Sequence, residues 1–174
     1  MSPVQEDPTP WRRLGETLEG SFAARAPGLL APDFAILGRE GEEIGRLEIQ
    51  GAEGAELGAG DLEARIERSA LSGYTMFTDG AEILTAEPRR AWNAPEIVCL
   101  GRLYQGRLSL LRNTARAGPA GEMATVRISG ALTNRNYEAV FDAGDEGSLP
   151  VAFFLLYLTA ALRRKAYLTG TKRC

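Results

Sequence analysis

The stretch Leu149-Pro150-Val151-Ala152-Phe153-Phe154-Leu155-Leu156-Tyr157-Leu158-Thr159-Ala160-Ala161-Leu162, followed directly by Arg163-Arg164-Lys165, decides the fold of this chain. No charged residue interrupts its 14 positions. A surface helix would show a polar stripe at the 3.6-residue period, whereas every face of this helix is apolar. Such a helix is either buried on all sides or placed in lipid, and this choice determines what the remaining residues must enclose.

The length of the stretch favours burial. At 1.5 Å per residue it is about 21 Å long, whereas the hydrocarbon core of a bilayer is about 30 Å thick. Pro150 suits a first helical turn, the basic cluster complements the negative end of the helix dipole, and Gly170 is suited to end the helix. We expect a buried helix over about residues 149–168. An interfacial or membrane-anchoring C-terminal helix is the alternative.

Composition and length describe one domain. The chain has 174 residues, of which 44% are hydrophobic and 25% charged, as in an ordinary globular protein. The acidic start, residues 1–7, lacks the apolar core of a signal peptide, so we expect a cytoplasmic protein, free or peripheral to the membrane. Cys99 lies in an apolar run and Cys174 is the last residue, which gives neither a metal-binding spacing nor a disulfide framework.

The net charge of −3 hides two halves of opposite sign. Residues 1–87 carry 7 basic and 17 acidic side chains, a net −10, and residues 88–174 carry 13 basic and 6 acidic ones, a net +7. Two interpretations remain open. The halves either form facing surfaces whose charges pair within one domain, or the second half offers a patch for anions such as phosphate or lipid headgroups.

The chain before the apolar helix is rich in predicted strands. Residues 1–30 form a lead-in with a helical stripe of Trp11, Leu14, Leu18 and Phe22. From residue 33 onward, short apolar runs are separated by Gly, Asp and Asn, which is typical of an all-β chain, while residues 51–60 are read as a loop of small residues. We expect about ten strands, at residues 34–37, 43–49, 62–66, 74–78, 81–85, 96–100, 103–104, 107–111, 124–128 and 136–141.

These elements fit together as a barrel. A helix that is apolar on every side must be covered on every side, and antiparallel strands that close around it achieve this while removing exposed sheet edges. The sequence therefore predicts a mainly β fold: a closed antiparallel β-barrel of about ten to twelve strands around a central hydrophobic C-terminal helix, with a short N-terminal helix or lead-in. Residues 31–174 form this single domain.

The order of elements resembles the tubby C-terminal-like superfamily, which includes plant LURP-one-related proteins and phospholipid scramblases. The residues that carry the resemblance are the turn-rich hairpin 34–49, the passage Gly130-Ala131-Leu132-Thr133-Asn134-Arg135-Asn136-Tyr137, the pair Phe141-Asp142 and the apolar helix. The resemblance implies a strand-rich barrel that encloses a C-terminal hydrophobic helix. Neither a calcium site nor lipid transport carries over, because the sequence has no acidic calcium loop and no cysteine cluster.

The sequence offers little for catalysis. It contains no histidine, which excludes histidine triads and histidine metal sites, and no phosphate-binding glycine motif follows a strand. We therefore predict no catalytic residue, no metal, no cofactor and no nucleic-acid partner. A small-ligand barrel or an enzyme with a site that lacks histidine is the alternative.

The remaining candidate is a basic patch that would bind anions. We expect a non-enzymatic binding or scaffold module whose partner is an anionic phospholipid headgroup or a protein, with peripheral membrane association. Oligomeric state is left open. The expected anion-binding residues are Arg102, Arg107, Arg112, Arg163, Arg164 and Lys165.

Overall fold

The computed structural model describes residues 9–28, 31–69, 72–89 and 91–171. Within them the chain forms two α-helices, one short 3-10 helix and twelve strands. The helices are α1 (Thr9–Leu18), η1 (Gly51–Glu53) and α2 (Ser148–Thr171). The strands are β1 (Ser21–Arg25), β2 (Asp33–Leu37), β3 (Glu43–Ile49), β4 (Gly54–Ala59), β5 (Leu62–Arg68), β6 (Tyr74–Thr78), β7 (Ala81–Pro88), β8 (Pro95–Cys99), β9 (Arg102–Ser109), β10 (Thr114–Pro119), β11 (Val126–Gly130) and β12 (Asn136–Phe141).

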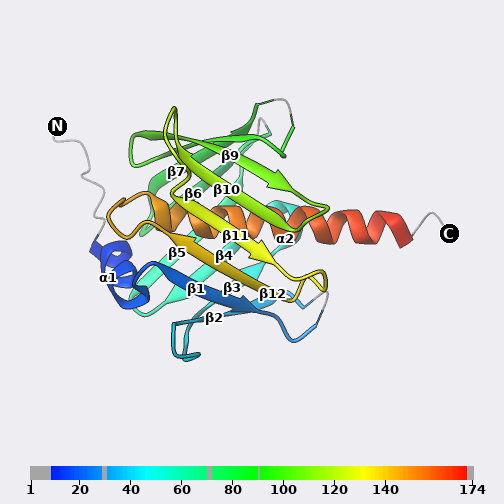
Figure 1. Ribbon diagram of the computed structural model, residues 1–174, viewed down its shortest axis with the longest axis horizontal. Helices are drawn as coiled ribbons and strands as arrows, with labels where there is room; N and C mark the ends of the chain where they lie inside the picture. The colour runs from blue at the N-terminus through cyan, green and yellow to red at the C-terminus, as the bar shows by residue number, and fades with distance from the viewer. Residues whose placement is uncertain (1–8, 29–30, 70–71, 90, 172–174) are drawn as a thin grey trace.

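The strands form a closed barrel in which each strand pairs with its neighbour in the chain (Figure 1). β1 pairs antiparallel with both β12 and β2, with Phe22 opposite Ala139 and Ala24 opposite Ile36, and so closes the ring. The predicted fold class, a closed antiparallel barrel around the C-terminal helix, is therefore confirmed. The predicted lead-in 1–30 contains one of the barrel strands, because β1 lies within it.

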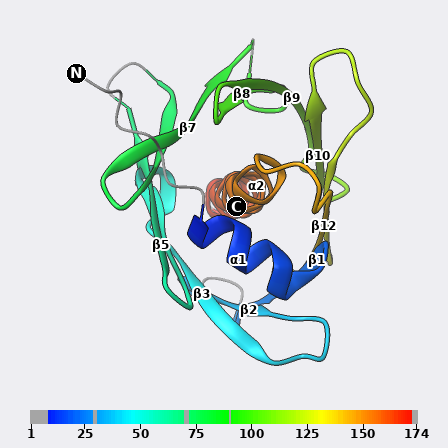
Figure 2. The same ribbon diagram turned by 90° about the vertical axis from the view of Figure 1, so that its left-hand side faces the viewer.

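Helix α2 fills the interior of the barrel, as the view along its axis shows (Figure 2). From Val151 to Ala160 every residue is at most 1% exposed. The strands contribute alternate side chains to the same core, so that Val126 and Ile128 of β11 face α2 while Arg127 faces solvent. The absence of any polar stripe on α2 thus follows from its enclosure on all sides.

The course of α2 differs from the expectation at its C-terminal end. The helix extends to Thr171 and does not end near residue 168 or at Gly170. Its enclosure also ends earlier, because Ala161, Leu162 and Arg163 are half-buried and Lys165 is exposed where α2 leaves the barrel (Figure 1). Among the described residues, no helix combines the length and apolar character that a membrane crossing requires.

Helix α1 covers the end of the barrel at which α2 begins (Figure 2). The predicted helical stripe is confirmed for Trp11, Leu14 and Leu18, which are buried, whereas Phe22 is buried but lies in β1 and not in the helix. The Trp11 ring lies 6.0 Å from that of Phe153, and Phe22 of β1 stacks on Phe153 at 4.5 Å. The Trp11 indole N–H also donates to Thr78 Oγ1 at 2.9 Å. We call this the capped end of the barrel, and the opposite end, where α2 leaves, the exit end.

The prediction of a loop over residues 51–60 is wrong. These residues form η1 and β4, in which Ala55, Leu57 and Ala59 alternate inward. The inward side chains of β4 are small because the helix already fills most of the barrel interior. The alternation of large apolar and polar residues by which a strand is recognised is therefore weak in this segment. Gly54 has φ 148° and a Cβ there would lie 1.9 Å from Ile66 O, so the glycine is required by a close approach of β4 to β5.

Asp79 and Gly80 form the two-residue turn between β6 and β7, which correspond to the expected strands 74–78 and 81–85. Asp79 has φ 51° and Gly80 has φ 79°, the left-handed pair that a tight two-residue turn needs. Successive connections in this barrel alternate between its two ends, because every strand is antiparallel to the next. The turn at Asp79 therefore lies at the capped end, and the connections on either side of it lie at the exit end.

Candidate functional site

The six cationic residues expected to bind anions lie in three separate places. Arg163, Arg164 and Lys165 lie on α2 at the exit end, and Arg112 lies there too, in the turn between β9 and β10. Arg102 lies at the capped end, where it pairs with Glu122 at 3.1 Å. Arg107 lies on the outer face of β9. The structure therefore brings four of the six to the exit end and separates Arg102 and Arg107 from them.

Arg163 holds α2 to the barrel. Its guanidinium donates hydrogen bonds to Asn134 Oδ1 and to the backbone oxygen of Leu110, and lies 3.4 Å from the backbone oxygen of Leu132. These acceptors belong to the two turns 110–113 and 131–135. Because its donors are used within the protein, Arg163 positions the helix and the two turns.

Arg164 is buried and forms no ion pair with a carboxylate in the described part of the chain. It is 9% exposed, and its guanidinium lies over the ring of Phe34, 4.9 Å from the centroid. Its Nε and Nη2 form no hydrogen bond with the described residues. Burial lowers the pKa of Arg164, which the neighbouring Tyr137 partly opposes. A buried cation that lacks an anion is costly, so this position is suited to receive one.

Two leucines project from the turns that Arg163 holds. Leu111 is 88% exposed and Leu132 is 80% exposed, and exposed arginines, Arg112 and Arg135, lie beside them in the same turns. We call Leu111, Arg112, Leu132, Arg135 and Lys165 the exit rim. Leu132 lies between the expected strands 124–128 and 136–141, which was a signal of an exposed apolar residue, whereas Leu111 is the last residue of the expected strand 107–111 and carried no such signal.

The two ends of the barrel differ in charge. The described residues of the six connections at the exit end, residues 26–28, 31–32, 50–53, 69, 72–73, 89, 91–94, 110–113 and 131–135, contain three arginines and one carboxylate, Glu53. The six at the capped end, residues 38–42, 60–61, 79–80, 100–101, 120–125 and 142–147, contain one basic residue and eight carboxylates. The connections therefore differ in charge along the barrel axis, positive at the exit end and negative at the capped end.

Among the described residues, no arginine of the second half forms an ion pair with a carboxylate of the acidic first half. In the described part of the chain, Arg89 pairs with Glu96 and Arg102 with Glu122 and Asp145, all within residues 88–174. An arginine of the first half does pair with the second half, because Arg12 forms an ion pair with Glu146. The interpretation that the opposite charges of the two halves neutralise each other in pairs is therefore not supported for the arginines.

Arg107 belongs to a row of cations on the barrel wall. It lies opposite Arg116 of β10, which in turn lies opposite Arg127 of β11, and all three are exposed. The three arginines line a hollow on the barrel wall. Glu96 and Glu122 line it too, but Glu96 pairs with Arg89 and Glu122 pairs with Arg102. Glu138 of β12 lies opposite Ser129, which is two residues from Arg127 along β11 and faces the same side of the sheet.

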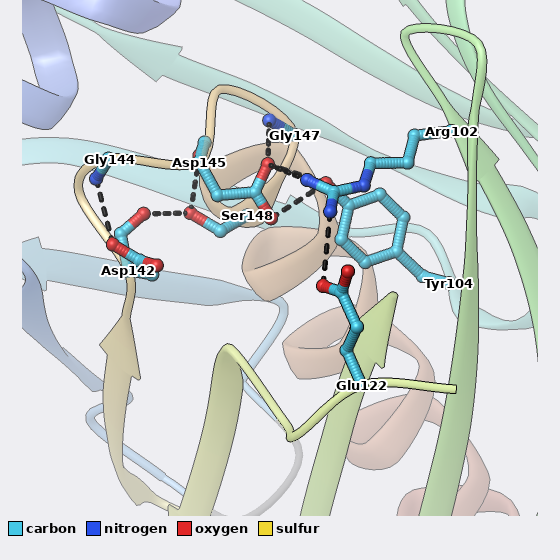
Figure 3. A network of polar contacts seen from close by, with 8 residues as sticks. All are labelled: Arg102, Tyr104, Glu122, Asp142, Gly144, Asp145, Gly147 and Ser148. Atoms are coloured by element: carbon cyan, nitrogen blue, oxygen red, sulfur yellow. Dashed lines mark hydrogen bonds and ion pairs between the residues drawn. The ribbon is translucent and has the colours of Figure 1, made fainter. Parts of the chain in front are cut away.

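The most connected polar cluster lies at the capped end and holds the start of α2 (Figure 3). The Tyr104 hydroxyl donates to both oxygens of Asp145, at 2.7 and 2.8 Å, and the Gly147 amide donates to the same carboxylate. The Ser148 hydroxyl donates to the backbone oxygens of Asp142 and Asp145. Burial and the Asp145 carboxylate raise the pKa of Tyr104. Because these groups satisfy one another, the cluster fixes α2 in the barrel.

Comparison with known proteins informs the fold and leaves the function open. No family model matches the chain, and no curated protein matches it. A solved structure of a protein from Arabidopsis thaliana is similar, with a TM-score of 0.56 and 10% sequence identity over 80% of this chain and 88% of that one. At this identity the similarity concerns the fold alone. Within the described residues, no group of three or more His, Cys, Asp or Glu side chains is arranged to hold a metal ion.

Proposed function

We propose that this protein is a binding module that docks its exit end on membranes containing anionic phospholipids. The observation that carries the proposal is the separation of charge along the barrel axis, with two exposed leucines at the positive end. An anionic surface attracts the exit end and repels the capped end, so the field orients the molecule before contact.

The exit rim supplies both parts of a membrane contact. Arg112, Arg135 and Lys165 are exposed cations, and each contributes about 1 kcal/mol near an anionic surface. Leu111 and Leu132 project on turns held by Arg163, so their insertion between headgroups removes apolar surface from water without reordering the backbone. Together these terms give weak, reversible binding that falls as salt concentration rises.

Co-sedimentation with lipid vesicles tests the proposal. The protein is expected to sediment with vesicles that contain phosphatidylserine and to remain in solution with pure phosphatidylcholine. The double variant Leu111→Ser/Leu132→Ser and the double variant Arg112→Glu/Arg135→Glu should each reduce binding at least tenfold. Equal binding to both vesicle types, or none to either, would exclude the proposal.

Matched controls locate the contact. Met123 is 83% exposed at the capped end, so Met123→Ser removes an equally exposed apolar side chain and should leave vesicle binding unchanged. Arg107→Glu reverses a charge in the row on the barrel wall and should change binding less than the charge reversal at the exit rim. If Arg107→Glu abolishes binding while the rim variants retain it, the docking face is the barrel wall and the proposed orientation is wrong.

We also propose that the chain is a distant member of the tubby C-terminal-like superfamily. The support is architectural: strands of a closed barrel come first in the chain, and an apolar C-terminal helix lies inside it. An experimental structure in which α2 lies outside the barrel would remove this support.

A further inference from the structure

A cavity lies beside α2 at the exit end. Arg163 ties one side of the helix to the turns 110–113 and 131–135, and α2 packs mainly against β10, β11 and β12. On another side, between α2, η1 and the start of β6, a cavity of about 600 Å³ remains. This volume is within the range of about 300–1,000 Å³ that is usual for small-molecule sites. We call it the exit cavity.

The walls of the exit cavity are mostly apolar. The Tyr74 hydroxyl donates to the backbone oxygen of Ala52 at 2.8 Å, so its polar atom is already satisfied. The Tyr74 ring packs on those of Trp92 and Tyr157, at 5.2 and 5.5 Å. A surface of this kind binds an alkyl or aromatic group. The larger apolar lining residues are Ile49, Tyr74, Trp92, Leu158 and Leu162, and Pro32, Ala52 and Ala161 complete the apolar wall.

The charged lining of the cavity has one sign. Arg68, Arg164 and Lys165 line it, and none of the carboxylates in the described part of the chain does. Arg164 is nine-tenths buried, forms no ion pair with the described residues, and has two guanidinium nitrogens without a hydrogen-bond partner. Because water is largely excluded from Arg164, an anion in the cavity would interact with it more strongly than with an exposed arginine.

We propose that the exit cavity binds a single-chain anionic amphiphile. The alkyl chain lies among Trp92, Leu158 and Leu162, and the carboxylate or phosphate group lies at Arg164. A fatty acid and an alkyl phosphate share this chemistry, because guanidinium donors match both anions. The site differs from the exit rim in its residues and takes one molecule from solution, so it does not rest on vesicle docking.

Isothermal titration calorimetry with soluble ten-carbon probes tests the ligand class. Decanoate and decyl phosphate, below their micelle concentrations, are expected to bind with a stoichiometry of one, and the tighter of the two identifies the preferred headgroup. Decanol and decyltrimethylammonium should bind at least tenfold more weakly. In a series from hexanoate to decanoate the affinity should rise by about fourfold per methylene, as the burial of alkyl surface requires.

Several outcomes would overturn the proposal. Equal affinity for the anionic and cationic probes would show that Arg164 does not bind the headgroup of the ligand. If inorganic phosphate bound as tightly as decyl phosphate, the site would recognise an anion without an alkyl chain. No binding of either anionic probe would show that the cavity is not a ligand site. Quenching of Trp92 fluorescence by a brominated fatty acid locates the chain, since Trp92 lines the cavity and Trp11 lies at the capped end.

Two variants separate the headgroup from the chain. Arg164→Met removes the charge at nearly constant side-chain length and should weaken decanoate binding at least tenfold without weakening decanol binding. Ala161→Leu places a larger side chain in the cavity and should weaken the binding of both decanoate and decanol. Arg112→Met, on the exit rim and outside the cavity lining, should change neither.

A stability readout keeps the test independent of calorimetry. Decanoate should raise the unfolding temperature of the wild-type protein and of Arg112→Met but not that of Arg164→Met. If Arg164→Met does not fold, Ala161→Leu and the probe series decide the question. Unchanged decanoate affinity in Ala161→Leu would then contradict the proposal.

Discussion

The enclosure of α2 makes a quantitative prediction for Leu155→Ala. Leu155 is 0% exposed and lies in the middle of the buried part of the helix. The substitution removes three carbon atoms, and at about 0.8 kcal/mol each their transfer costs about 2.4 kcal/mol. The void left behind adds about 24 cal/mol per Å³, and hydrogen bonds around the closed ring of strands resist its collapse. We expect a loss of about 3 to 5 kcal/mol in the free energy of unfolding.

Urea denaturation followed by tryptophan fluorescence measures this loss. Trp11 is 4% exposed and packs near Phe153 of α2, so its emission reports the loss of the core. For a chain of this size, a loss of about 3 kcal/mol corresponds to an unfolding temperature lower by about 6 to 12 °C. The matched control is Leu111→Ala, which makes the same chemical change at a side chain that is 88% exposed and should stay within about 0.5 kcal/mol of wild type.

The outcome discriminates between a buried and an exposed helix. If Leu155→Ala costs no more than Leu111→Ala, α2 is not enclosed and the reasoning from its uniform apolar faces fails. A chain that ends at Gly147 extends the test, because it lacks all of α2. We expect this chain to be unfolded by circular dichroism, whereas a soluble, folded product would show that the helix is a separable anchor.

Three further predictions follow from individual contacts. Gly54→Ala should cost more than about 1 kcal/mol because its Cβ would lie 1.9 Å from Ile66 O, whereas Gly58→Ala in the same strand has no atom within 4 Å of its Cβ and should be nearly neutral in urea denaturation. The Trp11–Thr78 hydrogen bond should give a coupling energy of about 0.5 to 1.5 kcal/mol in a double-mutant cycle of Trp11→Phe and Thr78→Val, and additive effects would show that the bond does not anchor α1. Burial raises the pKa of Tyr104, Tyr137 and Tyr157, so the folded state keeps protons that the unfolded chain releases above about pH 10. Stability is therefore fully present below about pH 10 and falls above it, by up to about 1.4 kcal/mol per pH unit for each tyrosine. Tyr104→Phe should reduce this slope, and an unchanged slope would contradict the assignment.

Much of the fold could be predicted because its signals are local. The uniform apolar faces of residues 149–162 require enclosure, and the alternation in strands such as β11 and β12 shows which side chains line it. The Asp79-Gly80 turn has backbone angles that few other residue pairs adopt. Each of these features depends on neighbours within a few residues, and the sequence records such neighbours directly.

The prediction failed where a residue depends on a distant contact. Residues 54–59 have small side chains and were read as a loop, because their strand pairing is set by the fit of β4 between β3 and β5. The helical stripe at Trp11 could be recognised from its spacing, but its contacts with Thr78 of β6 and Phe153 of α2 could not, because both residues are far along the chain.

The candidate site shows the same division. The sequence alone determined that the second half is basic, that Arg163, Arg164 and Lys165 follow the apolar run 149–162, and that histidine chemistry is excluded. Only the tertiary structure decided which cations meet. Antiparallel closure places alternate connections at opposite ends of the barrel, which collects Arg112, Arg135 and Lys165 at the exit end and leaves Arg102 at the other.

The three consecutive cations after the apolar stretch have three different environments for one physical reason. A helix turns by about 100° per residue, so the barrel rim meets each side chain differently. Arg163 holds two turns, Arg164 is buried over Phe34, and Lys165 is exposed. The sequence determined that a helix fills a barrel. Only the tertiary structure decided where along that helix the rim of the barrel lies. The position of the rim directs the Arg163 guanidinium to the turns and places Arg164 in the wall of the exit cavity.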